Sequence, residues 1–484
     1  MSKLIVVTGG AGFVGKHLVA RLIEDGHRVI VLDNFFAGTR TNRIDKAEYR
    51  EGHTKDIAAL VPERPDLIFH LGEYARVEQS VLEPEIVHDL NVVGTAAVIE
   101  FWRGVNAQGT RSKLVYAGSS TKFGDGGTTP ETSPYARTKA DNTGKVREIG
   151  EREQLPYAIT YFYNVYGPGE RGGIYGTVIE WFKEMYLRGD PIAVVSPGTQ
   201  VRNFTHVFDI VDALVMVGES GHGDEYGIGA ERAYSMLDVA HLFGTDVVML
   251  PPRPSNRMSS ELHTEKTRSL GWSPARDLAT YVRDFVSTHA RGAAHERRVL
   301  VLATSFYPTE GPAERALREL AEAMPDVTFD VVAAKMNDAA ATGLPANIVV
   351  HQVGTGHRLD KFLLPILGFH TAYALHKEHR YLFAWSLMAS YAAIAGVMLK
   401  AVARLPLLIT FADQDFERYG TVKRVILDHL VREADQVYGI GTQEEHANRV
   451  RRGRPLRQSL GEGDAFANQL RYAYATLLLR DTTI

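Results

Sequence analysis

The sequence predicts an α/β protein with two units, the first of which is a doubly wound parallel sheet. Over residues 1–286, short apolar runs alternate with helical patterns, which is typical of parallel strands covered by helices on both faces. A charged, alanine-rich connector follows at residues 287–298. A new strand, turn and helix then begin at residue 299, so we expect a second α/β domain over residues 299–484.

Length and composition indicate a multidomain globular protein. The chain has 484 residues, of which 45% are hydrophobic and 23% charged, and one core seldom serves such a length. The net charge of −4 gives no electrostatic reason to expect a nucleic acid or an anionic membrane as a partner. The absence of cysteine excludes disulfides and thiolate metal sites and fits a cytoplasmic location, and no metal site is predicted. The uncharged run at residues 381–399 is expected to be a buried helix rather than a membrane span.

The first apolar strand runs into a glycine-rich turn and then directly into a helical pattern. The turn carries Gly9, Gly12 and Gly15 within KLIVVTGGAGFVG at residues 3–15. Gly9 permits the tight turn, Gly12 lets a pyrophosphate approach the backbone, and Gly15 lets the helix pack close to the strand. The free N–H groups at the start of the helix suit an anion. This arrangement predicts a dinucleotide site in a Rossmann sheet.

Two acidic residues bear on which dinucleotide binds. Asp33 ends the second predicted strand, at residues 28–32, where it can accept both adenosine ribose hydroxyls and repel a 2′-phosphate. The sequence therefore predicts NAD rather than NADP. Asp56 precedes helical residues, so it either holds the adenine amino group or caps a helix.

Hydroxyl and lysine side chains follow the strand predicted at residues 113–117. Ser119 and Thr121 stand at its carboxyl end, where sites in open α/β sheets form. Tyr135 and Lys139 are four residues apart, so on a helix they share one face. A nearby ammonium lowers the pKa of a phenol, which makes Tyr135 usable as a general acid or base. Lys139 can also hold the nicotinamide ribose, and the Ser or Thr hydroxyl can hydrogen-bond the reacting oxygen.

Residues 1–286 resemble an extended short-chain dehydrogenase/reductase of the nucleotide-sugar epimerase type. The residues that carry the resemblance are TGGAGFVG at 8–15, Asp33, HLGEYA at 70–75, Asn91, SSTKFG at 119–124, YARTK at 135–139 and YNVYGPG at 163–169. The resemblance implies an NAD-binding Rossmann sheet with a small substrate-binding subdomain. It also implies a homodimer that pairs through the helices near Asn91 and Tyr135.

The same resemblance implies which residues contact the ligands. The cofactor contacts are Gly9, Gly12, Phe13, Val14, Gly15, Asp33, Asn34, Asp56, Ile57, Leu71, Gly72, Asn91, Tyr135 and Lys139. The substrate contacts are Glu73, Ser120, Asn164, Tyr175, Arg202, Arg253 and Ser260.

Several of these substrate contacts have a specific implied role. Asn164 and the two arginines, Arg202 and Arg253, would bind the nucleotide diphosphate, because that dianion suits always-charged donors. Ser260 would leave room for an N-acetyl group at the sugar 2-position. Glu73 stands where the family more usually has a small apolar residue, close to the expected nicotinamide.

The implied reaction is C4 epimerisation of a nucleotide sugar, most simply a UDP-hexose or UDP-N-acetylhexosamine. Tyr135 removes the 4-hydroxyl proton, C4 gives a hydride to NAD, and the 4-keto sugar turns its other face before the hydride returns. Related dehydratases carry Asp-Glu after the catalytic Thr, where this chain has Ser120-Thr121, so dehydration is disfavoured. A decarboxylase, a dehydratase and a non-catalytic nucleotide-sugar scaffold are the alternatives.

The second half resembles the N-terminal Rossmann-like domain of a GT-B glycosyltransferase. The residues that carry this resemblance are SFYPTEGPAER at 305–315, LLITFAD at 407–413 and ADQVYGIGT at 434–442. Too few residues follow Thr442 for the second domain that binds the sugar donor in that architecture. We therefore expect a truncated domain that transfers no sugar by itself, with a bifunctional epimerase–glycosyltransferase as the alternative.

Overall fold

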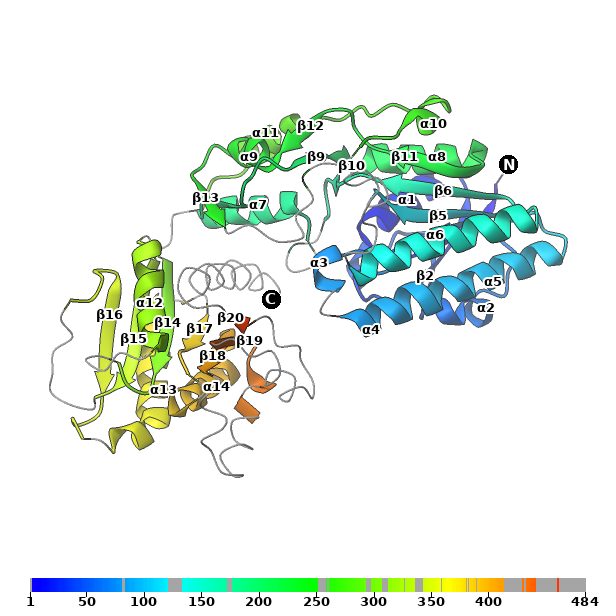
Figure 1. Cartoon of the computed structure of the whole chain (residues 1–484). Helices are drawn as coiled ribbons and strands as arrows, with labels where there is room; N and C mark the ends of the chain where they lie inside the picture. Colours follow the sequence, from blue (N-terminus) through cyan, green and yellow to red (C-terminus); the bar gives the residue numbers. More distant parts are fainter. Residues whose placement is uncertain are drawn as a thin grey trace. The chain divides into compact units, whose positions relative to one another are not determined.

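The chain forms two compact units, residues 1–292 and residues 293–484, in a computed structural model (Figure 1). Each unit holds a seven-stranded parallel sheet, which confirms the predicted α/β fold class. The structure describes residues 2–80, 83–120, 133–170, 172, 176–250, 258, 261–292, 297–306, 312–325, 327–335, 343–357, 359–379, 381, 383–388, 390–412, 429–430, 432–440 and 459–460.

The sheet of the first unit has the strand order β3-β2-β1-β4-β5-β6-β11, and all neighbours are parallel. Its strands are β1 Leu4–Thr8, β2 Arg28–Asp33, β3 Glu48–Glu51, β4 Leu67–His70, β5 Lys113–Ser119, β6 Tyr157–Phe162 and β11 Gly223–Ile228. The order reverses between β1 and β4. In sheets of this kind, ligands bind at the carboxyl ends of the strands beside that reversal.

Both faces of this sheet are buried by helices. Ile5 and Val7 of β1 pack in one apolar cluster with Leu18 of one helix and Leu214 of another, whereas Val6 packs in the opposite cluster with Trp102. Successive side chains of β1 point to opposite faces of the sheet, so this strand contributes apolar residues to the core on each face. The helices on the first face are α1 Phe13–Glu24 and α8 Val207–Ser220, and those on the second are α2 Ile57–Leu60, α5 Gly94–Ala107 and α6 Pro134–Arg152 (Figure 1).

In the described part of the first unit, three two-stranded sheets and further helices accompany the large sheet. The strand pairs are β7 Val165–Tyr166 with β10 Thr205–His206, β8 Ile192–Val195 with β13 Val247–Leu250, and β9 Val201–Asn203 with β12 Ala233–Ser235. The helices are α3 Val77–Ser80, α4 Pro84–Val87, α7 Val178–Arg188, α9 Met236–His241, α10 Glu265–Arg268 and α11 Leu278–Thr288. Short 3-10 turns lie at η1 Arg40–Asn42 and η2 Thr54–Asp56, and a π turn, η3 His88–Val93, joins α4 to α5.

The sheet of the second unit has the order β16-β15-β14-β17-β18-β19-β20, which is the same sequential order as in the first unit. Its strands are β14 Arg297–Ala303, β15 Val327–Ala334, β16 Ile348–Val353, β17 Ala384–Ser386, β18 Leu407–Ala412, β19 Gln436–Ile440 and β20 Ser459–Leu460. Its helices are α12 Pro312–Ala323, α13 Asp360–His379 and α14 Tyr391–Ala403.

Two expectations about element boundaries were wrong. The uncharged run at residues 381–399 is not one helix, because it contains strand β17 and then the start of α14. Among the described residues, no helix is long and apolar enough to cross a membrane. The expected connector at residues 287–298 is shorter, since α11 continues to Thr288 and β14 already begins at Arg297.

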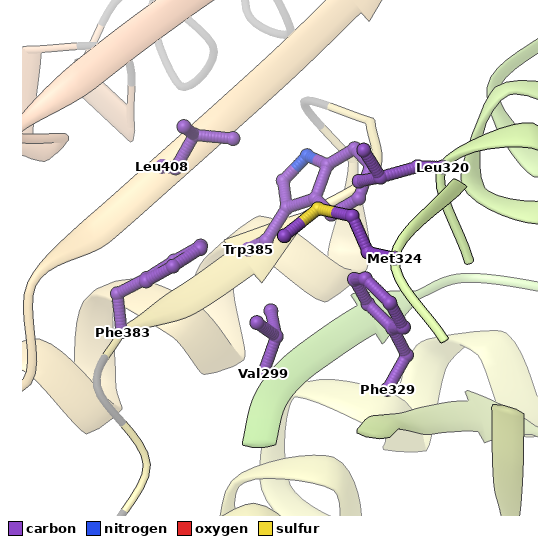
Figure 2. Close-up of a pocket in the computed structure, with 7 residues that line it drawn as sticks. All are labelled: Val299, Leu320, Met324, Phe329, Phe383, Trp385 and Leu408. Carbon is purple, nitrogen blue, oxygen red and sulfur yellow. The ribbon is translucent and has the colours of Figure 1, made fainter. Parts of the chain in front are cut away.

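The core of the second unit is apolar and closely packed. Figure 2 shows side chains from β14, β15, β18, α12 and the region of β17 around a small gap: Val299, Leu320, Met324, Phe329, Phe383, Trp385 and Leu408. The gap measures about 10 Å³. That is the space of one water at most, so it is a packing defect rather than a ligand site.

Candidate active site

A pocket opens at the carboxyl ends of β1, β2 and β4, where the strand order reverses. Its lining residues are Gly9, Gly12, Leu32, Asp33, Asn34, Phe36, Ala37, Gly38, Gly52, Thr54, Leu71, Gly72, Glu73 and Leu90. Six of the predicted cofactor contacts and Glu73 are in this set. The sequence did not single out the segments around Phe36 and Thr54, which contribute the other side of the pocket.

The glycine turn is shaped by contacts that leave no space for side chains. Gly9 has φ +72°, and a Cβ there would lie 2.8 Å from the Cα of Gly72. A Cβ on Gly15 would collide with the carbonyl oxygen of Gly9. The turn between β1 and α1 is therefore tight, and α1 packs directly on it, as the spacing predicted.

The N-terminus of α1 has exposed positive character. Gly12 is the N-cap, Phe13 and Val14 are the first helical residues, and within the described part of the chain no side chain caps this end. The first turn also contains no acidic residue. Gly12 lines the pocket, so the unpaired N–H groups and the helix dipole favour an anionic group there.

Asp33 is fixed at the side of the pocket by the backbone. Its Oδ2 accepts the N–H of Ala11 at 2.9 Å, and its Oδ1 accepts the N–H of Phe35 at 2.8 Å. Burial raises the pKa of this carboxyl despite both hydrogen bonds. Each oxygen keeps a lone pair for a ligand hydroxyl. The neighbouring Asn34 side chain accepts the N–H of Phe36 at 3.1 Å, which holds the following loop.

Two predicted cofactor contacts lie beside the pocket rather than in its lining. Asp56 is exposed at the end of η2, and Ile57 is buried in α2. Asp56 is the N-cap of α2, but within the described residues its side chain makes no capping hydrogen bond. Thr54 lines the pocket instead.

Asn91 is buried behind the site, and its side chain bonds to other parts of the chain. Its Oδ1 accepts the N–H of Tyr74 at 2.6 Å. Its Nδ2 donates to Thr138 Oγ1 at 3.0 Å and to the carbonyl of Tyr74 at 3.3 Å. Asn91 therefore holds the segment after β4 against α6, and shapes the site from behind.

Tyr135 and Lys139 lie in the first turns of α6, at the carboxyl end of β5. Ser133 is the N-cap of this helix, and its Oγ accepts the N–H of Ala136 at 3.1 Å. Both side chains are largely buried, as are Ser119 and Ser120 at the end of β5. Lys139 Nζ donates to the carbonyl of Ala117 at 2.6 Å, which joins α6 to β5. The structure thus brings Ser119, Tyr135 and Lys139 to one edge of the sheet, and Thr121 lies outside the described residues.

Glu73 connects the pocket to this group of residues. It lines the pocket, and its carboxylate forms an ion pair with Lys139. The same carboxylate accepts hydrogen bonds from Thr95 Oγ1 at 2.5 Å, Tyr116 OH at 3.0 Å and Asn142 Nδ2 at 2.8 Å. Burial favours the neutral acid, but the Lys139 ammonium and these donors hold the pKa of Glu73 below its usual range.

A chain of hydrogen bonds reaches Glu73 from the glycine turn. His70 Nδ1 is 2.7 Å from Thr8 Oγ1, and His70 Nε2 is 2.9 Å from Thr95 Oγ1. Because Thr95 donates to Glu73, the bonding pattern assigns the proton of the imidazole to Nε2. Burial lowers the pKa of His70 to about 4, so the ring is neutral near pH 7. Sequence reasoning missed these partners because they lie on separate elements, and Glu73 itself was the one signal.

The predicted diphosphate contacts that are described lie on adjacent segments. Asn164 follows β6, and its Nδ2 donates to the carbonyl of Asn203 at 3.3 Å. Arg202 precedes Asn203 on β9, and its Nη1 donates to the carbonyl of Val201 at 2.8 Å. Tyr175, Arg253 and Ser260 lie outside the described residues.

The loop after Asn164 is tied both to α1 and to α7. Lys16 Nζ donates to the carbonyl of Gly169 at 2.8 Å, and His17 Nε2 is 2.9 Å from the carbonyl oxygen of Pro168. Glu170 accepts the N–H and the hydroxyl of Thr177, the N-cap of α7, at 2.9 and 2.8 Å. Burial raises the pKa of Glu170 to about 7.

Comparison with known proteins places this site in a family. Residues 5–229 match the NAD dependent epimerase/dehydratase family. The UDP-glucose 4-epimerase of Mycolicibacterium smegmatis is 30% identical over 298 residues, which cover 57% of this chain and 94% of that protein. The chain belongs to the NAD dependent epimerase/dehydratase family. This confirms the predicted family and the prediction of NAD as its cofactor.

Other members of the family that resemble this chain differ in their reactions. The UDP-N-acetyl-alpha-D-glucosaminuronate decarboxylase of Bacillus cytotoxicus is 30% identical over 267 residues, covering 50% of this chain and 79% of that protein. The crystal structure of the Thermotoga maritima UDP-glucose 4-epimerase with UDP-glucose is 28% identical, with a TM-score of 0.54, and covers 59% of this chain and 97% of that one. Epimerase and decarboxylase relatives are thus similarly distant. The family match ends at residue 229, and the glycosyltransferase-like character of the second unit stays a prediction.

Proposed function

We propose that this protein epimerises C4 of a UDP-hexose or UDP-N-acetylhexosamine through a 4-keto intermediate. The observation that carries the proposal is the grouping of Ser119, Tyr135 and Lys139 at the end of β5. Glu73 contacts Lys139 and also lines the pocket behind the glycine turn, so this group borders the expected dinucleotide site. Residues that can deprotonate a hydroxyl group, placed next to a dinucleotide pocket, suit hydride transfer between a substrate and the dinucleotide.

The pocket fits NAD by its own chemistry. The uncapped end of α1, where Gly12 lines the pocket, would hold the pyrophosphate, and Asp33 would accept the adenosine ribose hydroxyls. Lys139 would donate to the nicotinamide ribose. When bound, NAD would supply the hydride acceptor and donor for C4.

The chain's own residues would move the proton. Tyr135 would take the proton of the sugar 4-hydroxyl and return it to the same oxygen after the sugar has turned. Ser119 would hydrogen-bond that oxygen, with Thr121 as the second candidate for this role. This reaction needs no acid or base besides Tyr135. It therefore requires the fewest catalytic groups among the candidate reactions.

The named relatives support a UDP-sugar as substrate, since they include UDP-glucose 4-epimerases and a decarboxylase that acts on a UDP-sugar. Asn164, Tyr175, Arg202 and Arg253 are the proposed contacts to its nucleotide. Glu73 and Ser120 are proposed near the sugar, and Ser260 would accommodate an N-acetyl group. We further propose that the enzyme is a homodimer paired through α5 and α6, and that the second unit transfers no sugar by itself.

Product analysis with the purified full-length chain tests the reaction. UDP-glucose, UDP-N-acetylglucosamine and UDP-glucuronic acid are incubated separately with NAD, and the products are identified by NMR and mass spectrometry. We expect a C4 epimer of unchanged mass from at least one of them. Loss of carbon dioxide would assign a decarboxylase, loss of water would assign a dehydratase, and the absence of any turnover would favour a binding scaffold.

Replacing the proposed proton-transfer residue tests the mechanism. Tyr135→Phe should lower kcat by at least about 100-fold, which is the lower range for a lost general acid–base group, and should leave the fold intact. Tyr157→Phe is the matched control, because Tyr157 begins β6 at the opposite edge of the sheet and its hydroxyl donates to Glu151. Turnover that survives in Tyr135→Phe would disprove the mechanism.

A further inference from the structure

Glu73 is a buried charge that takes no part in the proton and hydride transfers proposed above. The family resemblance leads to a small apolar residue at this position, whereas this chain places there a carboxylate of which only 1% of the side chain is exposed. A buried anion is costly unless donors surround it. Its retention in the site therefore calls for a role.

The donors around Glu73 come from three different elements. Thr95 belongs to α5, Tyr116 to β5, and Asn142 and Lys139 to α6, and all four donate to the same carboxylate. Such a carboxylate is fixed in position, because a rotation would break bonds to several elements at once. Thr95 is fixed in turn by the buried ring of His70.

Lys139 is held by this carboxylate on one side and by the sheet on the other. Of its three N–H donors, one goes to Glu73 and one to the carbonyl of Ala117. In the described part of the chain, this leaves one donor for a ligand. The ammonium and the carboxylate together carry no net charge, and Tyr135 lies one helical turn before Lys139.

We propose that Glu73 is a positioning residue whose carboxylate fixes the Lys139 ammonium and offsets its charge beside Tyr135. The proposal rests on the acid–base role of Tyr135 in the proposed function. Lys139 then offers its remaining N–H to the cofactor from a fixed position, and the Glu73 carboxylate opposes its charge beside Tyr135.

The other ionisable groups near Tyr135 leave this charge balance intact. His70 on β4 is neutral near pH 7, because burial lowers its pKa to about 4. Tyr116 on β5 is neutral too, since burial and the nearby Glu73 raise its pKa well above the ordinary value. Arg76, between β4 and α3, interacts electrostatically with Tyr135, Tyr74 and Glu170, and it is present in every variant below. A change at Glu73 therefore alters one charge.

The titration of Tyr135 itself tests the proposal. Tyrosine labelled with ¹³C at Cζ is incorporated into the full chain, and the Tyr135 signal is assigned by its loss in Tyr135→Phe. In Glu73→Gln we expect the Tyr135 midpoint to fall by about 1 pH unit relative to the wild-type chain, since one like charge is removed. An unchanged or raised midpoint would overturn the proposal. No substrate is present, so this result is independent of whether the chain is an epimerase.

A matched control removes a similar buried carboxylate elsewhere. Asp209 on α8 is 1% exposed on its side chain, pairs with Arg276 Nη1 at 2.5 Å, and accepts the N–H of Arg276 at 3.0 Å. Asp209→Asn should destabilise the fold to a similar degree and leave the Tyr135 midpoint unchanged. A shift in this control equal to that of Glu73→Gln would also overturn the proposal.

A pair of further variants keeps the test decisive if Glu73→Gln does not fold. Lys139→Met alone should raise the Tyr135 midpoint by about 1 pH unit, because Glu73 is then unopposed. Adding Glu73→Gln to Lys139→Met removes both charges, and neutral replacements of a whole buried pair are often tolerated. The double variant should have a Tyr135 midpoint close to the wild-type value and below that of Lys139→Met, because both opposing charges are then absent. If it stays as high as Lys139→Met, Glu73 does not act on Tyr135.

Discussion

At the scale of single residues, His70 links the end of β1 to the residues that surround Glu73. Its two ring nitrogens lie 2.7 Å from Thr8 Oγ1 and 2.9 Å from Thr95 Oγ1. Only the neutral ring completes this arrangement, since it needs one nitrogen as acceptor and one as donor. Protonation of His70 would therefore break the bond from Thr8 and bury a charge.

The stability of the first unit should consequently fall on mild acidification. The folded pKa of His70 is about 4, below the value of about 6.5 in an unfolded chain, so unfolding takes up a proton between these pH values. The stabilisation from neutral His70 is complete above pH 6.5 and is lost as the pH falls toward 4. Between pH 7.5 and pH 5.5 this group alone should lower the free energy of unfolding by about 1.3 kcal/mol.

Urea unfolding at the two pH values, in wild type and in His70→Gln, measures this contribution. The loss of stability between pH 7.5 and pH 5.5 should be about 1.3 kcal/mol smaller in His70→Gln. The exposed His289 serves as control, and His289→Gln should keep the wild-type dependence. Equal pH dependence in wild type and His70→Gln would show that His70 is not held neutral.

The site residues that could be predicted from sequence are those whose role depends on local spacing. Gly9, Asp33, Tyr135 and Lys139 each stand at a fixed offset from a strand end or a helix start, and the structure places them at one edge of the sheet. The network around Glu73 could not be predicted in the same way. Its members are Thr8, His70, Thr95, Tyr116 and Asn142. Their side chains meet only after five elements have packed.

At the scale of elements, the contact between α1 and the glycine turn sets the shape of the pocket. Gly15 lies in α1 with no space for a Cβ against Gly9. Gly104 lies in α5, and no described residue comes within 4 Å of the position its Cβ would take. Both are glycines inside helices, so their intrinsic helix propensities are the same. A difference in stability between alanine variants at these two positions therefore measures the effect of close packing.

Gly15→Ala should therefore be costly and Gly104→Ala harmless. The first change should lower the free energy of unfolding by roughly 1–3 kcal/mol, as overpacking does, and weaken NAD binding as α1 moves from the turn. The second should leave stability unchanged or raise it by up to about 1 kcal/mol. Urea unfolding and calorimetric titration with NAD measure both effects. Equal behaviour of the two variants would contradict the packing argument.

Long elements were predictable from sequence and short or interrupted ones were not. The predicted strands at residues 28–32 and 113–117 correspond to β2 and β5 to within a few residues, because each is a continuous apolar or β-branched run. Strand β17 has three residues inside an uncharged stretch, too few for a period to show. The π turn within the helix that contains Asn91 likewise leaves no trace in the apolar pattern.

At the scale of the whole molecule, two separate cores imply two units that can be tested apart. The first unit closes on itself, since Arg291 donates to the carbonyl of Gly189 at 3.1 Å and Gly292 to that of Tyr186 at 3.3 Å. The described residues of its two-sided apolar core all belong to the first unit. The domain boundaries proposed from sequence are consistent with a cut after Gly292.

A fragment of residues 1–292 should retain the proposed epimerisation. Its turnover is expected to stay within about twofold of the full chain, because a domain with its own core folds alone. It should also keep the proposed dimeric state, which sedimentation measures, since α5 and α6 belong to this unit. The full chain is the control and should show no sugar transfer. An inactive but folded fragment, or sugar transfer by the full chain, would assign the second unit a part in catalysis.

The ties from Lys16 and His17 to residues 168–169 have a thermodynamic consequence. They connect the helix that would hold the dinucleotide to the loop whose next residue, Glu170, accepts hydrogen bonds from Thr177 at the start of α7. A dinucleotide that immobilises α1 also restrains this loop. The conformational entropy lost when the dinucleotide binds is then not lost again when the substrate nucleotide binds. By reciprocity the coupling free energy is the same in both directions, so binding of either ligand raises the affinity of the protein for the other.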